Sequence, residues 1–295
     1  MSDSRTRRLI LTCVAGLTAL LVVIIAGKSA FGKRAGQEAE THPVPVNLNE
    51  TLKNEMSDTS SLAGFDKMVQ NYLTYWGIHG ASISVMRNDS LLFAKGYGEA
   101  DSGKKMEPGN ILRMASVSKL VTAVGIMVLQ ERGLLNLKDH VFGPDGILND
   151  STYNAAIKDT LYYRITVEDL LRHKGGFSKR GGDPMFSTRW IMMQNGWSEV
   201  PSQERLMEVQ LKRRLKFVPG SAQEYSNFGY LALSMVIEKV SGMDYETFIQ
   251  ENVLRPVGCV DFHIAGNYYK HKFPNETRYY VQHDDEPAEE FNNSG

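Results

Sequence analysis

A serine and a lysine lie three positions apart at the start of an apolar stretch of the sequence. Ser116 and Lys119 open this stretch, and no charged residue occurs from Leu120 to Leu129. Residues three apart share one face of a helix, so the hydroxyl and amine groups are expected side by side. At the first turn of a buried helix, desolvation and the positive helix end both favour the neutral amine, which can accept a proton. The pair is therefore a candidate for a serine nucleophile activated by lysine.

The same pair also has a purely structural interpretation. Ser116 can cap the helix, and the stem of Lys119 can lie along apolar surface while its charge reaches water. A second Ser-x-x-Lys sequence, Ser102 to Lys105, lies in a polar turn that contains glycine, and we expect it to be a solvated loop. The helix expected from Val117 to Arg132 is apolar on almost all sides between Leu120 and Leu129, which is typical of a helix buried in a core.

A tyrosine and an asparagine further along the chain are candidates to complete such a site. Tyr225-Ser-Asn227 is the one Tyr-x-Asn sequence in the chain, and it follows a turn-rich stretch that begins at Phe217. A phenolic oxygen close to positive charge can accept the serine proton and relay it to a leaving group. An asparagine side chain donates and accepts hydrogen bonds, so Asn227 can hold both the lysine and a substrate amide. Alternatively, Tyr225 packs on the core and Asn227 caps the next helix.

The elements that must position these residues follow a strand-then-helix order. Two short β-rich stretches, Ala81 to Met86 and Leu91 to Lys95, flank an Asn-Asp turn and predict a hairpin. Helices are expected at Leu62 to Tyr75, Val117 to Arg132, Thr166 to Leu171, Glu204 to Leu215, Gly229 to Val240 and Tyr245 to Leu254. Strands followed by helices predict an α+β domain, a layered α/β arrangement whose remaining strands come later in the chain.

Together these stretches resemble the class C β-lactamases and related serine hydrolases, a superfamily that includes D,D-peptidases and esterases. Ser116 to Lys119, followed by Leu129-Gln-Glu-Arg-Gly-Leu134, is similar to the helix that carries the nucleophile in that superfamily. Tyr225 to Tyr230 is similar to its second motif, and Arg255 to Gly258 is similar to the segment that closes the next helix. The resemblance extends from about Leu62 to Gly258.

Two parts of the sequence depart from the family pattern. Leu170 to Phe177 resembles a turn that usually reads Leu-Leu-x-His-Thr-Ser-Gly, but Lys174 and Gly175 stand in place of its Thr and Ser. A third motif, Lys or His-x-Gly, belongs on a downstream strand that supplies one of two oxyanion donors, and it does not occur after Asn227. We therefore expect residues 61–295 to form a β-lactamase/transpeptidase-like domain, an antiparallel sheet with a helical region, that lacks its C-terminal strands.

The resemblance implies an acyl-enzyme mechanism. Ser116 would attack an amide or ester carbonyl, with Lys119 and Tyr225 sharing the general acid and base roles. Asn227 would orient the lysine and the substrate. No cofactor is implied, and the sequence contains neither Cys-x-x-Cys nor His-Glu-x-x-His for a metal site. Gly182 to Phe186 is expected to be a loop near the pocket, with a purely structural loop as the alternative.

Three functions are compatible with this sequence. The first is a serine hydrolase whose substrate, a β-lactam, a peptidoglycan peptide or a small ester, is undetermined. The second is a penicillin-reactive binding or sensor domain that acylates with little turnover. The third is a catalytically inactive truncated protein.

The N-terminal sequence predicts a membrane anchor. Residues 1–8 contain three arginines, and no charged residue occurs from Leu9 to Gly27. The length of residues 9–27 favours a transmembrane helix, with a cleaved signal peptide as the alternative. The arginines favour a cytoplasmic N-terminus and an extracytoplasmic domain, which would be periplasmic in a bacterium. Residues 28–60 show no hydrophobic periodicity and are expected to be a linker.

Composition and charge argue against other classes of protein. The 295 residues are 42% hydrophobic and 23% charged, which are ordinary values for a globular protein. A net charge of -1 gives no basic surface for nucleic acid. The two cysteines, Cys13 and Cys259, do not form a disulfide framework.

Overall fold

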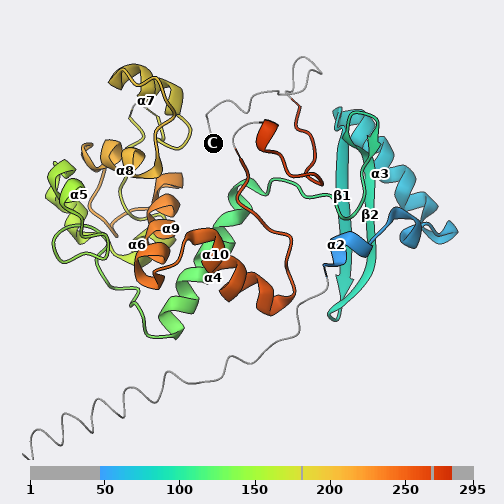
Figure 1. Cartoon of the computed structure of the whole chain (residues 1–295), viewed down its shortest axis with the longest axis horizontal. Helices are drawn as coiled ribbons and strands as arrows, with labels where there is room; N and C mark the ends of the chain where they lie inside the picture. Colours follow the sequence, from blue (N-terminus) through green and yellow to red (C-terminus); the bar gives the residue numbers. More distant parts are fainter. Residues whose placement is uncertain (1–46, 181, 267–268, 281–295) are drawn as a thin grey trace, which may run out of the picture. The chain divides into compact units, whose positions relative to one another are not determined.

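The computed structural model describes residues 47–180, 182–266 and 269–280 (Figure 1). These residues belong to one compact unit, Pro45–Gly295. The segments expected to be cytoplasmic (1–8) and membrane-spanning (9–27), and most of the expected linker (28–60), lie outside the described residues. Within the described part of the chain, no helix is both long enough and apolar enough to cross a bilayer.

The described elements follow the predicted order, with a hairpin before most of the helices. The α-helices are α2 (Leu48–Thr51), α3 (Ala63–Trp76), α4 (Ser118–Glu131), α5 (Ser151–Ala156), α6 (Val167–Leu171), α7 (Thr188–Asn195), α8 (Gln203–Leu211), α9 (Asn227–Ser241) and α10 (Tyr245–Ile249). The strands are β1 (Gly80–Arg87), β2 (Ser90–Asp101) and β3 (Lys104–Lys105). Short 3-10 turns are Asn54–Ser57, Ser60–Leu62, Ala115–Val117, Thr160–Arg164, Arg255–Val257 and Tyr269–His271, and Gln250–Leu254 is a π-helical turn.

Strands β1 and β2 form the predicted antiparallel hairpin, with Arg87 opposite Ser90. Asn88 and Asp89 between them both have left-handed backbones, with φ of 49° and 58°. A two-residue hairpin turn of type I′ needs positive φ at both positions, and Asn and Asp tolerate it best after glycine. Strand β3 pairs with the end of β2, so the sheet among the described residues has the order β1-β2-β3.

Helix α3 lies along the sheet and forms a small hydrophobic core with it (Figure 1). Val69 and Leu73 of α3 are buried against Phe93 and Tyr97 of β2, and Phe65 packs edge-on to the ring of Phe93. Apolar residues four apart lie on one helix face, which is why α3 can cover this surface. The helix ends at Gly77, whose left-handed backbone (φ 62°) favours glycine.

Residues 54–57, within the expected linker, are packed on the sheet. The Ser57 hydroxyl donates to the Ala94 carbonyl (2.9 Å) and accepts from the Ala94 N–H (3.2 Å). The Asn54 amide donates to the Met106 carbonyl (2.7 Å) and accepts from the Gly96 N–H (2.7 Å). These side chains satisfy backbone groups of β2 and of Met106, which follows β3, and this tertiary role leaves no hydrophobic periodicity in the sequence.

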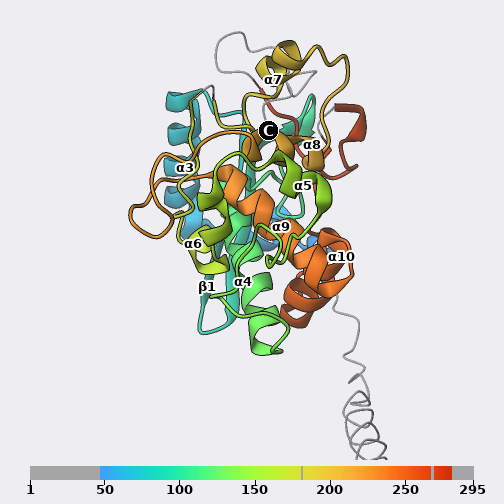
Figure 2. The same ribbon diagram turned by 90° about the vertical axis from the view of Figure 1, so that its left-hand side faces the viewer.

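The larger hydrophobic core lies among the helices. Helix α9 is its centre and packs against α4, α6, α8 and α10 (Figure 2). Val236 and Ile237 of α9 are fully buried, as is Ile126 of α4. The buried Tyr162 hydroxyl donates to the carbonyl of Gln210 (2.7 Å), so this core also satisfies its polar groups.

Helix α4 is not buried on all sides, contrary to the prediction from its apolar sequence. One face carries four buried residues, Thr122, Gly125, Ile126 and Leu129. Three apolar side chains at helical spacing are exposed, namely Leu120 (68%), Val124 (48%) and Met127 (47%). Their spacing places them on one stripe of the helix. The apolar sequence of a helix shows which of its faces can be buried, but not which faces pack against another element.

The helix boundaries otherwise differ from the predictions mainly at their ends. Helix α6 begins as predicted, because Thr166 and Asp169 form a reciprocal capping box. Helix α8 ends at Leu211 rather than Leu215. The last predicted helix is split into α10 and the π-helical turn Gln250–Leu254. Helices α2, α5 and α7 were not predicted, because they are short, with four, six and eight residues.

Candidate active site

The four residues singled out in the sequence lie together where α4 and α9 begin. The Ser116 Oγ is 2.6 Å from the Tyr225 Oη. The Lys119 Nζ donates to the Ser116 Oγ (3.1 Å) and to the Asn227 Oδ1 (2.8 Å). Ser116 is exposed, whereas Lys119 and Asn227 are partly buried. One hydrogen-bonded chain therefore joins tyrosine, serine, lysine and asparagine, with the serine hydroxyl open to an incoming molecule.

The backbone next to Ser116 is unusual. The 3-10 turn Ala115–Val117 leads directly into α4, so Ser116 stands at the positive end of that helix. Ala115 has a φ of 46°, in the left-handed region that a residue with a Cβ avoids. Strained backbone of this kind persists only where the surrounding structure holds it, and it is frequent at functional sites.

Lys119 is enclosed by aromatic and polar groups. Its Nζ lies 5.0 Å from the ring centre of Tyr225 and 5.7 Å from that of Tyr230. With the bonds to Ser116 and Asn227, these contacts hold the amine inside the site. The Lys119 side chain therefore does not extend into water, which was the structural alternative for this residue.

The turn Leu170–Phe177, which resembles a family segment, holds Tyr225 in place. The Glu224 N–H donates to the His173 carbonyl (2.9 Å), and the Ser226 N–H donates to the His173 Nδ1 (3.2 Å). The rings of His173 and Tyr225 are 4.6 Å apart. His173 therefore contacts Tyr225 directly and binds the residue on each side of it.

Burial is the main reason that the pKa of His173 is lowered from 6.5, and the nearby charges of Lys119 and Lys179 act in the same direction. The neutral imidazole keeps an unprotonated Nδ1, which is what the Ser226 N–H needs as its acceptor. His173 thus supports the site as a neutral ring.

The pKa of the Tyr225 phenol is lowered by its neighbours. Burial alone would raise its pKa, but hydrogen bonding by Lys119 and Ser116 and the charge of Lys119 bring the pKa below its ordinary value of 10.0. A phenol with a lowered pKa holds its proton less tightly. This suits an oxygen that exchanges a proton with the Ser116 hydroxyl.

Asp183 belongs to the same network, although the sequence analysis did not single it out. Its Oδ2 accepts from the Asn227 Nδ2 (3.1 Å) and from the Asn227 N–H (3.3 Å). The expected loop Gly182 to Phe186 thus reaches the site through this one carboxylate. The Asp-Pro pair signals a turn in the sequence, but nothing local shows which residue the carboxylate meets.

The second Ser-x-x-Lys sequence lies elsewhere. Ser102 is exposed in the turn between β2 and β3, as predicted, whereas Lys105 is exposed but belongs to strand β3, where it pairs with Glu99, rather than to a loop. Among the described residues, no group of three or more His, Cys, Asp or Glu side chains is placed to hold a metal ion.

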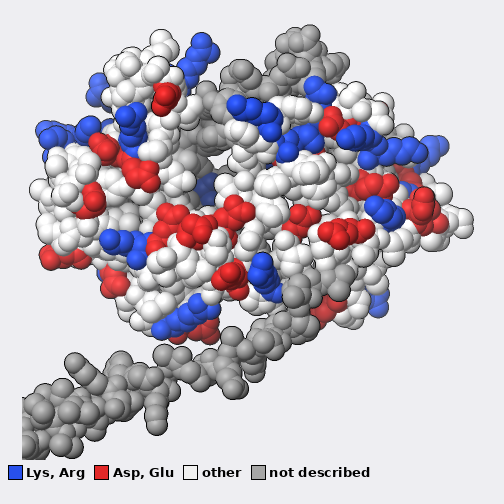
Figure 3. Space-filling model, viewed as in Figure 1, with Lys and Arg blue, Asp and Glu red and all other residues white. Residues whose placement is uncertain are grey.

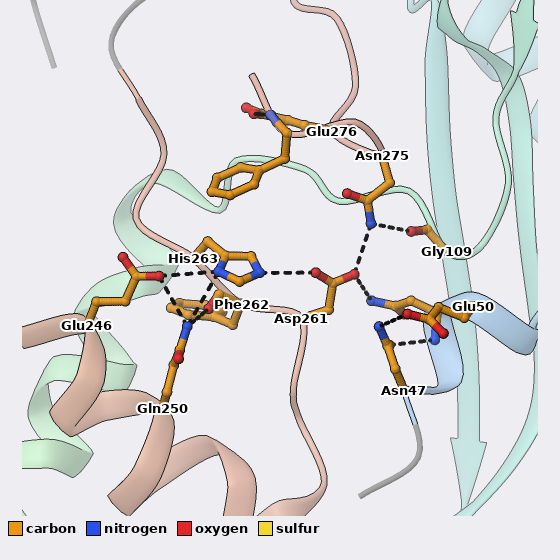
Figure 4. Close-up of polar contacts among 12 residues, drawn as sticks. Asn47, Glu50, Gly109, Glu246, Gln250, Asp261, Phe262, His263, Asn275 and Glu276 are labelled. Atoms are coloured by element: carbon orange, nitrogen blue, oxygen red, sulfur yellow. Dashed lines mark hydrogen bonds and ion pairs between the residues drawn. The ribbon is translucent and has the colours of Figure 1, made fainter. Parts of the chain in front are cut away.

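A separate polar cluster surrounds His263 (Figure 4). Its Nδ1 is 3.2 Å from Glu246 and its Nε2 is 3.3 Å from Asp261. Asp261 also accepts from the Asn275 Nδ2 (2.9 Å). Asp261 and His263 line a mainly apolar cavity of about 450 Å³ that also borders Ala115. The cluster links α10 to the C-terminal part of the described chain, because its members come from both segments.

The charged side chains on the face drawn in Figure 3 include both signs, interspersed.

The chain is similar to known proteins over most of its length. A profile of the Beta-lactamase family matches residues 65–294. Penicillin-binding protein 4* of Bacillus subtilis (strain 168) is 27% identical over 165 residues, which cover 55% of this chain and 32% of that protein. Protein flp of Staphylococcus aureus (strain N315) is 29% identical over 196 residues, which cover 65% of this chain and 36% of that protein. The chain thus spans about a third of the length of these relatives.

Solved structures with the same fold include penicillin-binding and hydrolytic proteins. An octameric penicillin-binding protein homologue from Pyrococcus abyssi has a TM-score of 0.56 and 24% identity, covering 75% of this chain and 48% of that one. EstCE1, a hydrolase with promiscuous acyltransferase activity, has a TM-score of 0.56 and 23% identity, covering 77% and 58%. These likenesses confirm the predicted α+β fold of the β-lactamase/transpeptidase type. With the profile match to residues 65–294, they show that this chain belongs to the Beta-lactamase family.

Proposed function

We propose that this protein is a serine hydrolase that cleaves an amide or ester through an acyl-serine intermediate. The observation that carries the proposal is the placement of the Ser116 Oγ between the Tyr225 Oη (2.6 Å) and the Lys119 Nζ (3.1 Å). A serine hydroxyl becomes a nucleophile when a neighbouring group can take its proton. Here two such groups lie within hydrogen-bonding distance of the exposed hydroxyl.

In the first half of the proposed reaction, the Ser116 Oγ attacks the substrate carbonyl carbon while its proton passes to Tyr225 or Lys119. The Ser116 N–H is the first donor to the oxygen that becomes negative. When the tetrahedral species collapses, the bond to the leaving amine or alcohol breaks, and the same group returns the proton to it. Water then attacks the acyl-serine and releases the acid.

The relatives support this class of chemistry and offer a probe for it. Penicillin-binding protein 4* is named for binding penicillin. The site contains a serine, two proton acceptors and an amide donor, which together suit a β-lactam amide as well as an ester or a peptide. A penicillin-reactive domain with little turnover would use the same four residues, so acylation and turnover must be measured separately.

The test is labelling of the full-length protein with a fluorescent penicillin and with a fluorophosphonate. We expect an adduct in the wild type and in Ser102→Ala, and none in Ser116→Ala. Release of a chromogenic ester or β-lactam product over many cycles would establish a hydrolase, and a stable adduct alone would establish the binding domain instead. A folded wild type that forms no adduct with either probe contradicts the proposal.

We also propose that residues 9–27 anchor the protein and place the domain outside the cytoplasm. The support is the uncharged stretch with arginines before it. Full-length protein should fractionate with membranes, and a shortened chain that begins at Pro45 should not. This start keeps Asn54 and Ser57, which bind the sheet. Recovery of protein that begins near Ala30 in the soluble extracytoplasmic fraction would show signal cleavage instead.

A further inference from the structure

The carboxylate of Asp183 is held in one orientation by its own loop. Its Oδ1 accepts from the Met185 N–H (3.0 Å), which leaves Oδ2 directed at Asn227. The loop is also tethered from outside, because the Arg213 guanidinium donates to the Gly182 carbonyl (2.8 Å). Asp183 therefore presents a fixed acceptor to whatever lies against its Oδ2.

Asn227 lies between that acceptor and a donor. Its Nδ2 donates to the Asp183 Oδ2 (3.1 Å), and its Oδ1 accepts from the Lys119 Nζ (2.8 Å). An ionised carboxylate only accepts hydrogen bonds, and the Lys119 Nζ donates one to the amide oxygen. The amide thus has one orientation that satisfies both neighbours. Flipping the amide would turn its NH₂ group towards the N–H groups of Lys119 and its oxygen towards the Asp183 carboxylate.

We propose that Asp183 is a positioning residue that orients the Asn227 amide and through it keeps the Lys119 amine at the Ser116 hydroxyl. This inference rests on the proposed acyl-serine function. Asp183 reaches the nucleophile only through Asn227 and then Lys119, so it acts through Asn227 rather than on the substrate.

The isosteric change Asp183→Asn separates this role from simple loop packing. The Met185 N–H holds one side-chain oxygen, so the new amide would turn its NH₂ towards the Asn227 NH₂. Two donors cannot pair, and Asn227 relieves the conflict by flipping, which turns its NH₂ towards Lys119. A side chain needed only to fill its place in the loop would tolerate this change.

The experiment compares rates of Ser116 acylation by a fluorescent penicillin in the full-length protein. We expect Asp183→Asn to acylate about 10- to 100-fold more slowly, the effect of losing one hydrogen bond to a charged group. In an Asn227→Ala background, Asp183→Asn should cause no further loss. The matched control is Asp150→Asn, because Asp150 caps α5 outside this network and asparagine also caps helices. That control should acylate at the wild-type rate.

A second measurement does not depend on catalysis. The side-chain amide protons of Asn227, assigned by their absence in Asn227→Asp, should exchange with water faster in Asp183→Asn than in the wild type. An acylation rate within twofold of wild type in Asp183→Asn, or an equal loss in the Asn227→Ala background, would overturn the inference. If the wild type forms no adduct, the acyl-serine function fails, and amide exchange alone still decides whether Asp183 holds Asn227.

Discussion

The Ser116 Oγ and the Tyr225 Oη are 2.6 Å apart, although 109 positions separate the two residues in the chain. Ser116 is placed by the turn before α4, and Tyr225 is placed by the connection that enters α9. The contact exists because α4 and α9 pack together in the larger core. Variants of the four central residues should therefore affect acylation in ways that depend on their place in the network.

Lys119→Ala should slow acylation of Ser116 by about 10²–10⁴-fold, since it removes a proton acceptor and the partner of Asn227. Ser102→Ala and Lys105→Ala are the controls and should leave the rate unchanged, because both residues are exposed, in the β2–β3 turn and in β3, and neither belongs to this network. The measurement is the rate of adduct formation with a fluorescent penicillin. If Lys119 were only a surface charge, its loss would change stability by about 0.5 kcal/mol and leave acylation intact.

Tyr225→Phe should slow acylation by about 10²–10⁴-fold, because it removes the phenolic oxygen and keeps the ring. The pH profile gives a second test. Where Tyr225 accepts the proton as a phenolate, the wild-type rate should fall as pH falls through the pKa of Tyr225, which lies below 10.0. The profile of Tyr225→Phe should lack this limb. An unchanged limb in the variant would assign it to another group.

His173→Gln should make stability less sensitive to acid. The pKa of His173 is lowered in the folded protein, so the unfolded chain binds more protons in the interval below 6.5. Stability from this residue is therefore present above about pH 6.5 and is lost as pH falls through that interval. Glutamine keeps an acceptor for the Ser226 N–H but does not titrate. The difference in melting temperature between about pH 7.5 and about pH 5 should be smaller in the variant, and an equal or larger difference would contradict this assignment.

Two glycine substitutions should change stability in opposite directions. A Cβ on Gly96 would lie 2.4 Å from the carbonyl carbon and oxygen of Met106, so backbone must move. We expect Gly96→Ala to destabilise the protein by about 1–3 kcal/mol.

Gly64 lies in α3, where an added Cβ would meet no neighbouring atom within 4 Å, and Gly64→Ala should stabilise the protein by about 0.5 kcal/mol. Denaturant unfolding measures both, and a Gly96→Ala variant as stable as wild type would contradict the close approach.

Local patterns in the sequence predicted the hairpin, most helices and the adjacency of Ser116 and Lys119. Asn88 and Asp89 favour the left-handed turn that β1 and β2 need, and Thr166 with Asp169 caps α6. The spacing of Ser116 and Lys119 places both on one helix face. Each of these features depends on residues within about one helical turn or one hairpin, where chain geometry alone brings them together.

Only the tertiary structure decided which distant groups meet. The Tyr-x-Asn sequence singled out Tyr225 and Asn227, but the packing of α4 against α9 brings them to Ser116 and Lys119. The Asp183 carboxylate reaches Asn227 across 44 positions, and Ser57 reaches β2 across 37. The sequence also could not show that one apolar stripe of α4 is exposed. Side-chain chemistry sets what a residue can bind, whereas its actual partner depends on how whole helices and strands pack, which no short stretch of sequence encodes.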